Sequence, residues 1–345
     1  MPKDAGEGPS TSADGTTDAS AGAVADAAVA GDSTEAAPLS MPVDATFEAA
    51  EDAPPSSPAD APSAEAGDVV RSGCDPNAPF GPPVLLAGMD LNTANEEGGP
   101  HLTPDELTLF LSGRGRRDGT SVSDLFVAHR PAVTSPFEVP VALPSLDSTG
   151  NEFDPSTSAD ALVVFFTSDR PSALGGADIW TATRANVAAD FGAPIDMAAP
   201  FNSAGNDAQP FESADGTTLW FSSDRAGGAG GYDIYEAPLA GGPATRVAEL
   251  ASADDDFCPT PSADGLLIFF SSSRPDGAAL GGRDIWSASR ASVSDPFSNV
   301  HDESELNSAA DDFPGWLSAD GCRLYMSSTR PGVGSEDIYV ATRTR

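Results

Sequence analysis

The chain has 345 residues, with 53 Asp and Glu against 17 Lys and Arg, so its formal net charge at pH 7 is -36. A charge of this sign excludes tight binding to nucleic acid, because Lys and Arg hold a phosphate backbone, and it disfavours attachment to anionic lipid. The single lysine, Lys3, leaves a folded domain without the lysine of a P-loop or of a Schiff base. No apolar run approaches the length of a membrane span, and the first residues lack the apolar segment of a signal peptide. We expect no nucleic-acid partner and no transmembrane segment.

Composition divides the chain into two parts. Residues 1–78 are rich in Ala, Pro, Ser and acidic residues and contain one aromatic residue, Phe47. Such a segment buries too little apolar surface to offset its loss of conformational entropy. We therefore predict a disordered acidic tether over 1–78 and a folded domain over 79–345, which holds all the other aromatic residues.

One phrase recurs five times in the folded part, at 103–114, 158–170, 213–225, 262–274 and 318–330. It starts with a Ser/Thr-x-Asp turn, continues through a short apolar run and ends in arginine. A Gly-rich stretch then leads to Asp-apolar-aromatic, at 124–126, 178–180, 233–235, 284–286 and 337–339. Each unit offers four short strands, which we name A to D, and a four-stranded unit repeated about every 50 residues is typical of a propeller blade.

The two ends of the repeat array complement each other. The chain ends after the third strand of the fifth unit, whereas Phe80–Val84 matches 191–195, the fourth strand of another unit. A strand near Phe80 would complete the last unit and remove the open edges of a linear array. The sequence thus predicts an all-β, five-bladed β-propeller of four-stranded blades with 3+1 closure and a disordered N-terminal tail.

These units resemble the TolB-type, WD-repeat-like propeller repeat, whose signature is Ser-Pro-Asp-Gly, an apolar strand, Ser-x-Arg and Asp-Ile-Tyr. The resemblance covers roughly 79–345, although Ala replaces Pro in four copies and Glu106 or Ala161 stands where the repeat prefers Gly. It implies an envelope-associated binding platform, periplasmic or bound to the outer membrane and lipoprotein-like, with an export signal lost or lying upstream.

Simple structural roles account for most repeated residues. The turn Asp suits a hydrogen bond to nearby backbone, and the aromatic residue after Asp-Ile suits packing between blades. We also expect the repeated arginine to pair with the Asp before Ile inside each blade.

A polar set precedes the first strand of each unit, where Asn/Asp-Ser/Thr is followed by two polar or acidic residues. Strand parity places these D–A loops and the Arg-to-Asp B–C loops on one face. We predict that this is the binding face, with a ring of acids near the channel at Glu97, Glu152, Asp207, Asp256 and Asp312.

Carboxylates ~10 Å apart repel by ~0.4 kcal/mol in water and by ~1.7 kcal/mol at an effective dielectric of 20. We favour compensation by the repeated arginines, Arg114, Arg170, Arg225, Arg274 and Arg330. A bound cation or a basic partner segment stays open.

The cysteines are too scattered for a zinc site or a disulfide scaffold. Cys74 precedes the closing strand and Cys322 begins the second strand of the same blade. We expect a bridge between them that locks the closure, while Cys258 on an innermost strand stays a buried free thiol.

The pattern favours a noncatalytic, monomeric, extracytoplasmic scaffold that binds a protein, peptide or glycan through its D–A/B–C face. A five-bladed glycoside hydrolase that uses channel carboxylates, or a cation-binding propeller, is the alternative. Catalysis normally singles out one blade, whereas these acids recur in every blade, so repetition favours a scaffold. We assign no catalytic residue, no metal ligand and no cofactor.

Overall fold

The structure is a computed structural model that describes residues 74–116, 121–171, 174–275 and 281–344. The chain divides into two units, Met1–Ala64 and Glu65–Arg345. The first unit lies outside the described residues, as does most of the segment 1–78 that the sequence predicts to be a disordered tether.

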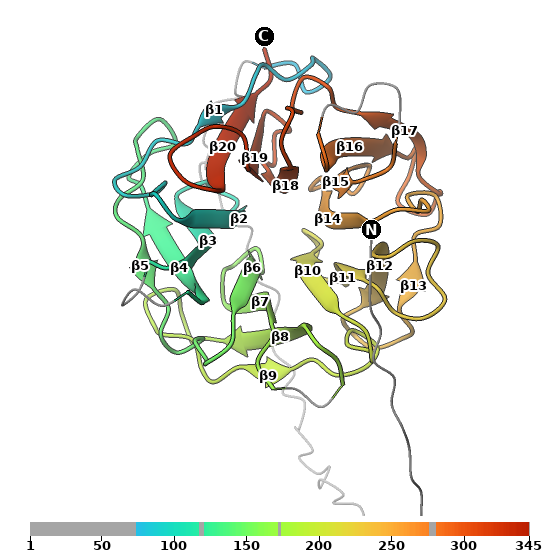
Figure 1. Cartoon of the computed structure of the whole chain (residues 1–345), viewed down its shortest axis with the longest axis horizontal. Helices are drawn as coiled ribbons and strands as arrows, with labels where there is room; N and C mark the ends of the chain where they lie inside the picture. Colours follow the sequence, from blue (N-terminus) through green and yellow to red (C-terminus); the bar gives the residue numbers. More distant parts are fainter. Residues whose placement is uncertain (1–73, 117–120, 172–173, 276–280, 345) are drawn as a thin grey trace, which may run out of the picture. The chain divides into compact units, whose positions relative to one another are not determined.

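The second unit is an all-β, five-bladed propeller, and this prediction is confirmed. Five antiparallel sheets of four strands surround a central axis (Figure 1). Blade 1 contains β2 (Glu96–Leu102), β3 (Thr108–Arg114), β4 (Ser123–His129) and β5 (Val141–Ala142); blade 2 contains β6 (Glu152–Thr157), β7 (Val163–Ser168), β8 (Asp178–Thr183) and β9 (Ile195–Asp196). Blade 3 contains β10 (Asp207–Glu212), β11 (Thr218–Ser223), β12 (Asp233–Pro238) and β13 (Thr245–Arg246); blade 4 contains β14 (Asp256–Pro261), β15 (Leu267–Ser272), β16 (Asp284–Ser289) and β17 (Ser298–Asp302). Blade 5 joins β18 (Asp312–Leu317), β19 (Arg323–Ser328) and β20 (Asp337–Thr342) to β1 (Val84–Leu85).

The ring closes through the N-terminal strand, as predicted. Strand β1 pairs antiparallel with β20, with Val84 opposite Val340 and Leu85 opposite Tyr339. An isolated bridge joins Phe80 to Arg343. The fourth strand of blade 5 therefore comes from the opposite end of the folded unit, and the two ends of the ring are joined by backbone hydrogen bonds.

The core lies between neighbouring blades. Phe110 and Leu125 of blade 1, for example, pack in one cluster with Val164 and Phe166 of blade 2, and all four are fully buried. Burial of each such side chain contributes about 1.5–3 kcal/mol. Because the second strand of every blade is buried on both faces, it reads as a continuous apolar run rather than as an alternating one.

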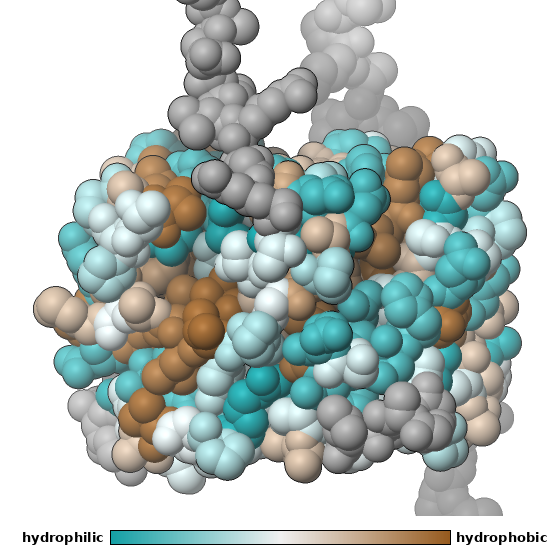
Figure 2. All heavy atoms as spheres, turned by 90° about the horizontal axis from the view of Figure 1, so that it is seen from above, coloured by the Kyte–Doolittle hydropathy of each residue, from teal (hydrophilic) through white to brown (hydrophobic). Residues whose placement is uncertain are grey.

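The outer edge is short in four blades, while β17 of blade 4 has five residues. Strands β1, β5, β9 and β13 contain two residues each, which limits the unpaired backbone that an edge exposes. Side chains such as Val141 and Ile195 remain more than 60% exposed there. Figure 2 shows apolar patches of this kind scattered over a mainly hydrophilic outer wall.

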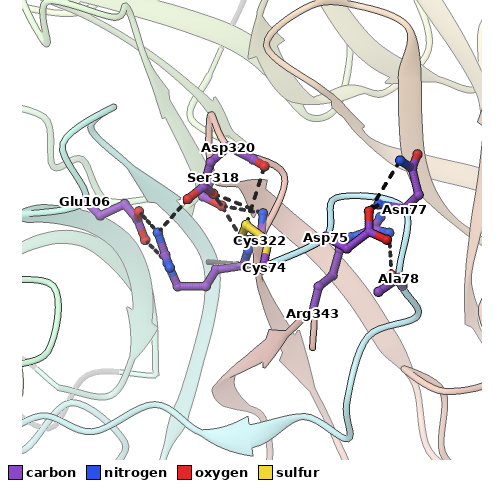
Figure 3. Close-up of a disulfide and its surroundings, with 10 residues drawn as sticks. Cys74, Asp75, Asn77, Ala78, Glu106, Ser318, Asp320, Cys322 and Arg343 are labelled. Atoms are coloured by element: carbon purple, nitrogen blue, oxygen red, sulfur yellow. Dashed lines mark hydrogen bonds and ion pairs between the residues drawn. A yellow bond between two sulfur atoms is a disulfide. The ribbon is translucent and has the colours of Figure 1, made fainter. Parts of the chain in front are cut away.

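A disulfide joins Cys74 to Cys322 beside the closure, with the two Cα atoms 6.1 Å apart (Figure 3). The backbone amide of Asp75 donates to the Thr344 carbonyl at 3.2 Å, next to the bridge. The bridge therefore ties the segment before β1 to the start of β19 in blade 5, the blade that β1 completes.

Each innermost strand contains a register shift. The shifts fall at 98–101, 153–156, 208–211, 257–260 and 314–316. In the first four blades the residue in the shift has left-handed backbone geometry, with φ of 58° at Gly99, 49° at Asp154, 54° at Gln209 and 53° at Cys258. Such β-bulges re-aim side chains, and here they do so beside the central axis.

Candidate functional site

The five acids predicted to ring the channel are instead buried inside their own blades. Glu97, Glu152, Asp207, Asp256 and Asp312 have 0% exposure, and none lines the central cavity. Each carboxylate accepts a hydrogen bond from the backbone amide four residues earlier, at Thr93, Ser148, Ser203, Ser252 and Ser308. Side chains alternate along a strand, so the residue before or after each acid faces the axis instead.

Blade 3 shows how each acid is held. The Asp207 carboxylate accepts hydrogen bonds from the Ser203 amide at 2.6 Å, from the Ser223 hydroxyl, and from the Arg225 guanidinium at 2.7 Å. The same guanidinium lies 4.8 Å from the ring centre of Tyr235. A buried charge is tolerated when it is both paired and hydrogen-bonded. We call this acid–arginine–aromatic arrangement the intrablade clamp, and its role is structural.

The clamp recurs in every blade. Its ion pairs elsewhere are Arg170–Glu152, Arg274–Asp256 and Arg330–Asp312, each made by the arginine that the repeat indicates, and Arg116–Glu97 in blade 1. The prediction of Arg114 as the compensating cation of blade 1 is wrong. Arg114 instead pairs with Glu96 at 3.2 Å and is 39% exposed.

The exception in blade 1 has a geometric cause. Gly113 lies opposite Glu97. In the other blades this position is a serine, and the motif arginine follows two residues after it. Arg114 follows Gly113 directly, so its side chain falls on the other face of the strand. A Cβ atom at Gly113 would collide with the Arg116 side chain, so the glycine leaves room for Arg116 to reach the acid.

In blades 3 and 5 the Asp before Ile is engaged elsewhere than at the predicted motif arginine. Asp233 lies 3.5 Å from Arg246, and Asp337 holds the B–C loop by accepting hydrogen bonds from the amides of Val333 at 2.6 Å and Gly334 at 3.0 Å. The motif arginines of these two blades pair with the acid of the innermost strand. The turn Asp behaves as predicted: Asp160 accepts from Ser158 and from the Leu162 amide, and these bonds lower its pKa.

A cavity of about 420 Å³ lies on the propeller axis. Innermost strands of all five blades line it, together with Tyr232, Arg283 and Glu336 from B–C loops. These three residues each stand immediately before the Asp of Asp-Ile, so the repeat brings them to equivalent places around one mouth. The cavity lies on the face that the sequence predicts to bind, but residues other than the predicted ones build it.

The fivefold pattern breaks down inside this cavity. The bulge residues that line it are Gly99, Asp154, Gln209, Cys258 and Gly315, so two blades have glycine there and the other three have chemically different side chains. Gly99 brings blade 1 close to blade 2, since a Cβ atom there would lie 2.9 Å from the Asp154 Cα. Gln209 is fixed by its neighbour, because its Oε1 accepts a hydrogen bond from the Cys258 amide at 3.2 Å. One bulge out of these five therefore presents a carboxylate.

Two carboxyl groups in the cavity titrate near neutrality. Desolvation by burial raises the pKa of Asp154 from 3.8 to about 7. Burial is also the main cause that raises the pKa of Glu336 from 4.5 to about 7; a hydrogen bond from Ser327 lowers it, and repulsion from Glu96 and Asp154 raises it further. Acidic groups tuned to this range are enriched at functional sites.

Two other titratable groups of the cavity wall are neutral at pH 7. Burial lowers the pKa of His101 to about 3, so its ring carries no charge. Burial, with a smaller contribution from Asp154 and Glu336, raises the pKa of the free thiol Cys258 well above its usual value. The carboxylates therefore dominate the charge on this part of the wall.

Aromatic rings form another part of the wall. The ring centre of Phe257 lies 6.2 Å from those of Tyr232 and Phe313. The Arg283 guanidinium lies 5.0 Å from the Phe257 ring centre and 3.7 Å from the Asp311 carboxylate. Burial is the main cause that raises the pKa of Tyr232 to about 12, and repulsion from nearby aspartates is a smaller one. The Tyr232 hydroxyl therefore remains a hydrogen-bond donor at pH 7.

A second repeated phrase marks the cavity in the sequence. In four blades the buried acid is followed three residues later by proline, as Glu/Asp-x-x-Pro, and these prolines are Pro100, Pro155, Pro210 and Pro259. The residue directly before each proline is the bulge residue. Alignment on this phrase shows that Asp154 stands where other blades have Gly, Gln or Cys. The repeated acids do not reveal this signal, because the cavity is distinguished by the positions at which the repeat varies.

No protein-family model matches the chain, and no curated protein matches it. Among solved structures, the α-L-arabinofuranosidase PaAbf62A from Podospora anserina aligns with a TM-score of 0.50 and 11% identity over 79% of this chain and 98% of that one. TolB from Acinetobacter baumannii aligns with a TM-score of 0.44 and 17% identity, over 72% of this chain and 56% of TolB. The exo-β-1,3-galactanase 1,3Gal43A from Clostridium thermocellum aligns at 0.49 and 12%, over 75% of this chain and 62% of that one.

These likenesses concern the fold alone. Within the described residues, the structure contains no helix long and apolar enough to cross a membrane. What the chain binds has to be argued from the cavity itself.

Proposed function

We propose that the chain is a noncatalytic binding propeller, which takes a protein, peptide or glycan on its D–A/B–C face and seats part of that ligand in the central cavity. The observation that carries the proposal is the loss of symmetry there. The intrablade clamp is kept in all five blades, whereas the bulge residue of the cavity is Gly in two blades and Asp, Gln and Cys in the other three. A purely structural axis gives no reason for an isolated carboxyl group at Asp154, but a ligand does.

We also propose an extracytoplasmic location and a monomeric state. The bridge between Cys74 and Cys322 supports the location, because disulfides persist mainly in oxidising compartments. The large negative net charge supports the monomer, because like-charged copies repel one another.

The binding proposal is tested by narrowing the cavity. Ala208 lines the cavity at the register where β6, β14 and β18 carry Phe153, Phe257 and Phe313, so an Ala208→Phe variant copies a side chain that the fold already accepts. Labelled full-length protein would be probed against arrays of defined oligosaccharides and short peptides. We expect wild type to bind a restricted set and Ala208→Phe to bind that set at least ~10-fold more weakly, a loss of about 1.4 kcal/mol.

The matched control is Ala188→Phe, which adds the same ring at an exposed position outside the cavity. It should bind like wild type. Equal binding by Ala208→Phe and wild type, or an absence of any array ligand, would refute the proposal that the cavity seats a ligand.

A glycoside hydrolase is the second candidate, and one observation favours it. Such enzymes need two carboxyl groups beside the scissile bond, one of them protonated at working pH, and Asp154 and Glu336 lie in one cavity with raised pKa values. Release of 4-nitrophenol from a panel of 4-nitrophenyl glycosides tests this function. A hydrolase would lose activity in both Asp154→Asn and Glu336→Gln, whereas a binding protein releases nothing in any variant.

A further inference from the structure

The central cavity carries an excess of acidic side chains. Asp154, Glu96 and Glu336 line it together with Arg283. Glu96 is paired with Arg114, and Arg283 lies beside Asp311, so these charges are largely balanced. Glu336 takes a hydrogen bond from Ser327. The Asp154 carboxylate, in contrast, has no hydrogen-bond or ion-pair partner among the residues that the structure describes.

The backbone holds Asp154 in this unfavourable place. Its φ of 49° lies in the left-handed region, which residues other than Gly, Asn and Asp seldom occupy. The equivalent bulge residues of blades 3 and 4 bond to each other, because the Cys258 amide donates a hydrogen bond to the Gln209 side chain. A carboxylate that borders a cavity and has no partner among the described residues suggests a positively charged partner from outside the chain.

The aromatic part of the wall suits the same partner. Arginine guanidinium groups already lie over these rings, with Arg283 5.9 Å from the Phe313 ring centre and Arg114 5.8 Å from that of Phe153. The rings therefore accept cations on their faces, as the quadrupole of an aromatic ring favours. The cavity thus combines a free carboxylate with cation-accepting rings and apolar proline surfaces.

A metal ion fits this cavity poorly. In the described part of the chain, one group of three metal-ligating side chains converges within 4.8 Å, formed by Asp124, Asp147 and Glu152, and none of these lines the cavity. The cavity acids therefore do not converge in the way that a calcium or zinc site requires. An organic cation needs one carboxylate and gains from apolar walls that contact its carbon chain.

We propose that the central cavity binds a primary alkylammonium group, with Asp154 as its counter-ion and the surrounding rings as its cation-accepting wall. The proposal rests on the proposed function, since it names the chemistry of the ligand that the cavity seats. An alkylammonium group is supplied either by a lysine side chain of a peptide or by a free diamine or polyamine. The negative charge of the whole chain would draw either of them toward the cavity.

Calorimetric titration of the full-length protein at low salt and pH 8 tests this. The probes are 1,5-diaminopentane, the neutral isostere 1,5-pentanediol, and a lysine residue capped as N-acetyl-lysine methylamide. We expect at least one of the two amines to bind wild type, and to bind Asp154→Asn at least ~10-fold more weakly, because the counter-ion is lost. Asn keeps the left-handed backbone at low energetic cost, so the variant retains the fold.

The matched control is Asp190→Asn, which removes the same charge from an exposed position outside the cavity. Its affinity should stay within about twofold of wild type. Stronger binding of capped lysine identifies a peptide as the source of the alkylammonium group. Stronger binding of the diamine identifies a free diamine or polyamine as its source. Both results support the proposal.

Equal affinity of wild type and Asp154→Asn, equal binding of the diol, or no binding of either amine to wild type would overturn the proposal. These failures are separable from failure of the proposed function, because the Ala208→Phe comparison reports whether any array ligand uses the cavity. A cavity that binds array ligands but no amine leaves the binding function intact and refutes the ammonium site.

Discussion

Arg323 donates a hydrogen bond from Nε to Glu106 Oε2 at 2.6 Å, and this ion pair joins blade 5 to blade 1. The same carboxylate oxygen accepts the Tyr325 hydroxyl at 2.7 Å. Arg130 approaches Glu106 from the other side, with an N–O distance of 3.8 Å. Glu106 stands where three other blades have glycine (Gly216, Gly265 and Gly321), and its φ of 61° shows why glycine would be easier. The departure from the repeat is thus explained by a contact across the junction that closes the ring.

Replacement of Glu106 by Gln should destabilise the propeller by about 3 kcal/mol, because it removes the acid that faces the buried Arg130 and leaves Arg323 with only its 3.4 Å contact to Asp320 among the described acids. Urea unfolding measures the change. Glu138→Gln, which alters an exposed glutamate, should leave the free energy of unfolding within about 0.5 kcal/mol of wild type. Equal stability of the two variants would show that the junction does not depend on this ion pair.

The two arginines of blade 1 should differ in the same assay. Arg116 is 7% exposed and pairs with the fully buried Glu97, so Arg116→Ala should lower stability by about 3 kcal/mol. Arg114 is 39% exposed and pairs with Glu96 at the surface, so Arg114→Ala should lower it by less than about 1 kcal/mol. A larger loss of stability in Arg114→Ala than in Arg116→Ala would support Arg114 as the arginine that compensates Glu97, as the repeat alone predicts.

The disulfide should stabilise the closure. Reduction, or Cys322→Ser, should lower the free energy of unfolding by about 2–4 kcal/mol, because the bridge closes a loop across a sequence separation of 248 residues in the unfolded chain. Hydrogen exchange should then speed up first at the amides of β1 and β20, which form the seam. Cys258→Ser serves as the control, since it removes a thiol without opening the bridge. Unchanged exchange at the seam after reduction would show that β1 holds without the bridge.

The sequence predicts the fold well because the fold is set by what repeats. Turn residues, apolar runs and the Asp-Ile-aromatic strand recur at fixed spacing, and even the closing strand keeps the Phe-Gly-x-Pro pattern of its equivalent at 191–195. The site is harder, for two physical reasons. A shift of one residue moves a side chain to the opposite face of a strand, so Glu97 is buried while Glu96 lines the cavity. The bulge that aims Asp154 at the axis leaves no mark in the hydrophobic pattern.

Stability should fall as pH rises from about 4 to about 8, and Asp154 should account for part of the fall. In the unfolded chain this carboxyl group titrates near 3.8, whereas in the folded protein its pKa is about 7. Between these values the folded state keeps a proton that the unfolded state has released, so the free energy of unfolding decreases with pH. Glu336 and Glu212, whose pKa values are also raised to about 7, contribute with the same sign.

Asp154→Asn removes one of these titrations and should flatten the curve. Below about pH 3 the variant should match wild type, because the carboxyl group then holds its proton in both the folded and the unfolded wild-type chain. At pH 8 the wild type carries a partly buried carboxylate that has no partner among the described residues, so the variant should be more stable by about 2–4 kcal/mol. Urea unfolding across this pH range measures both curves, with Asp190→Asn as the control that keeps the wild-type slope. If Asp154→Asn also keeps that slope, the carboxylate is either solvated or already paired, and it needs no external cation.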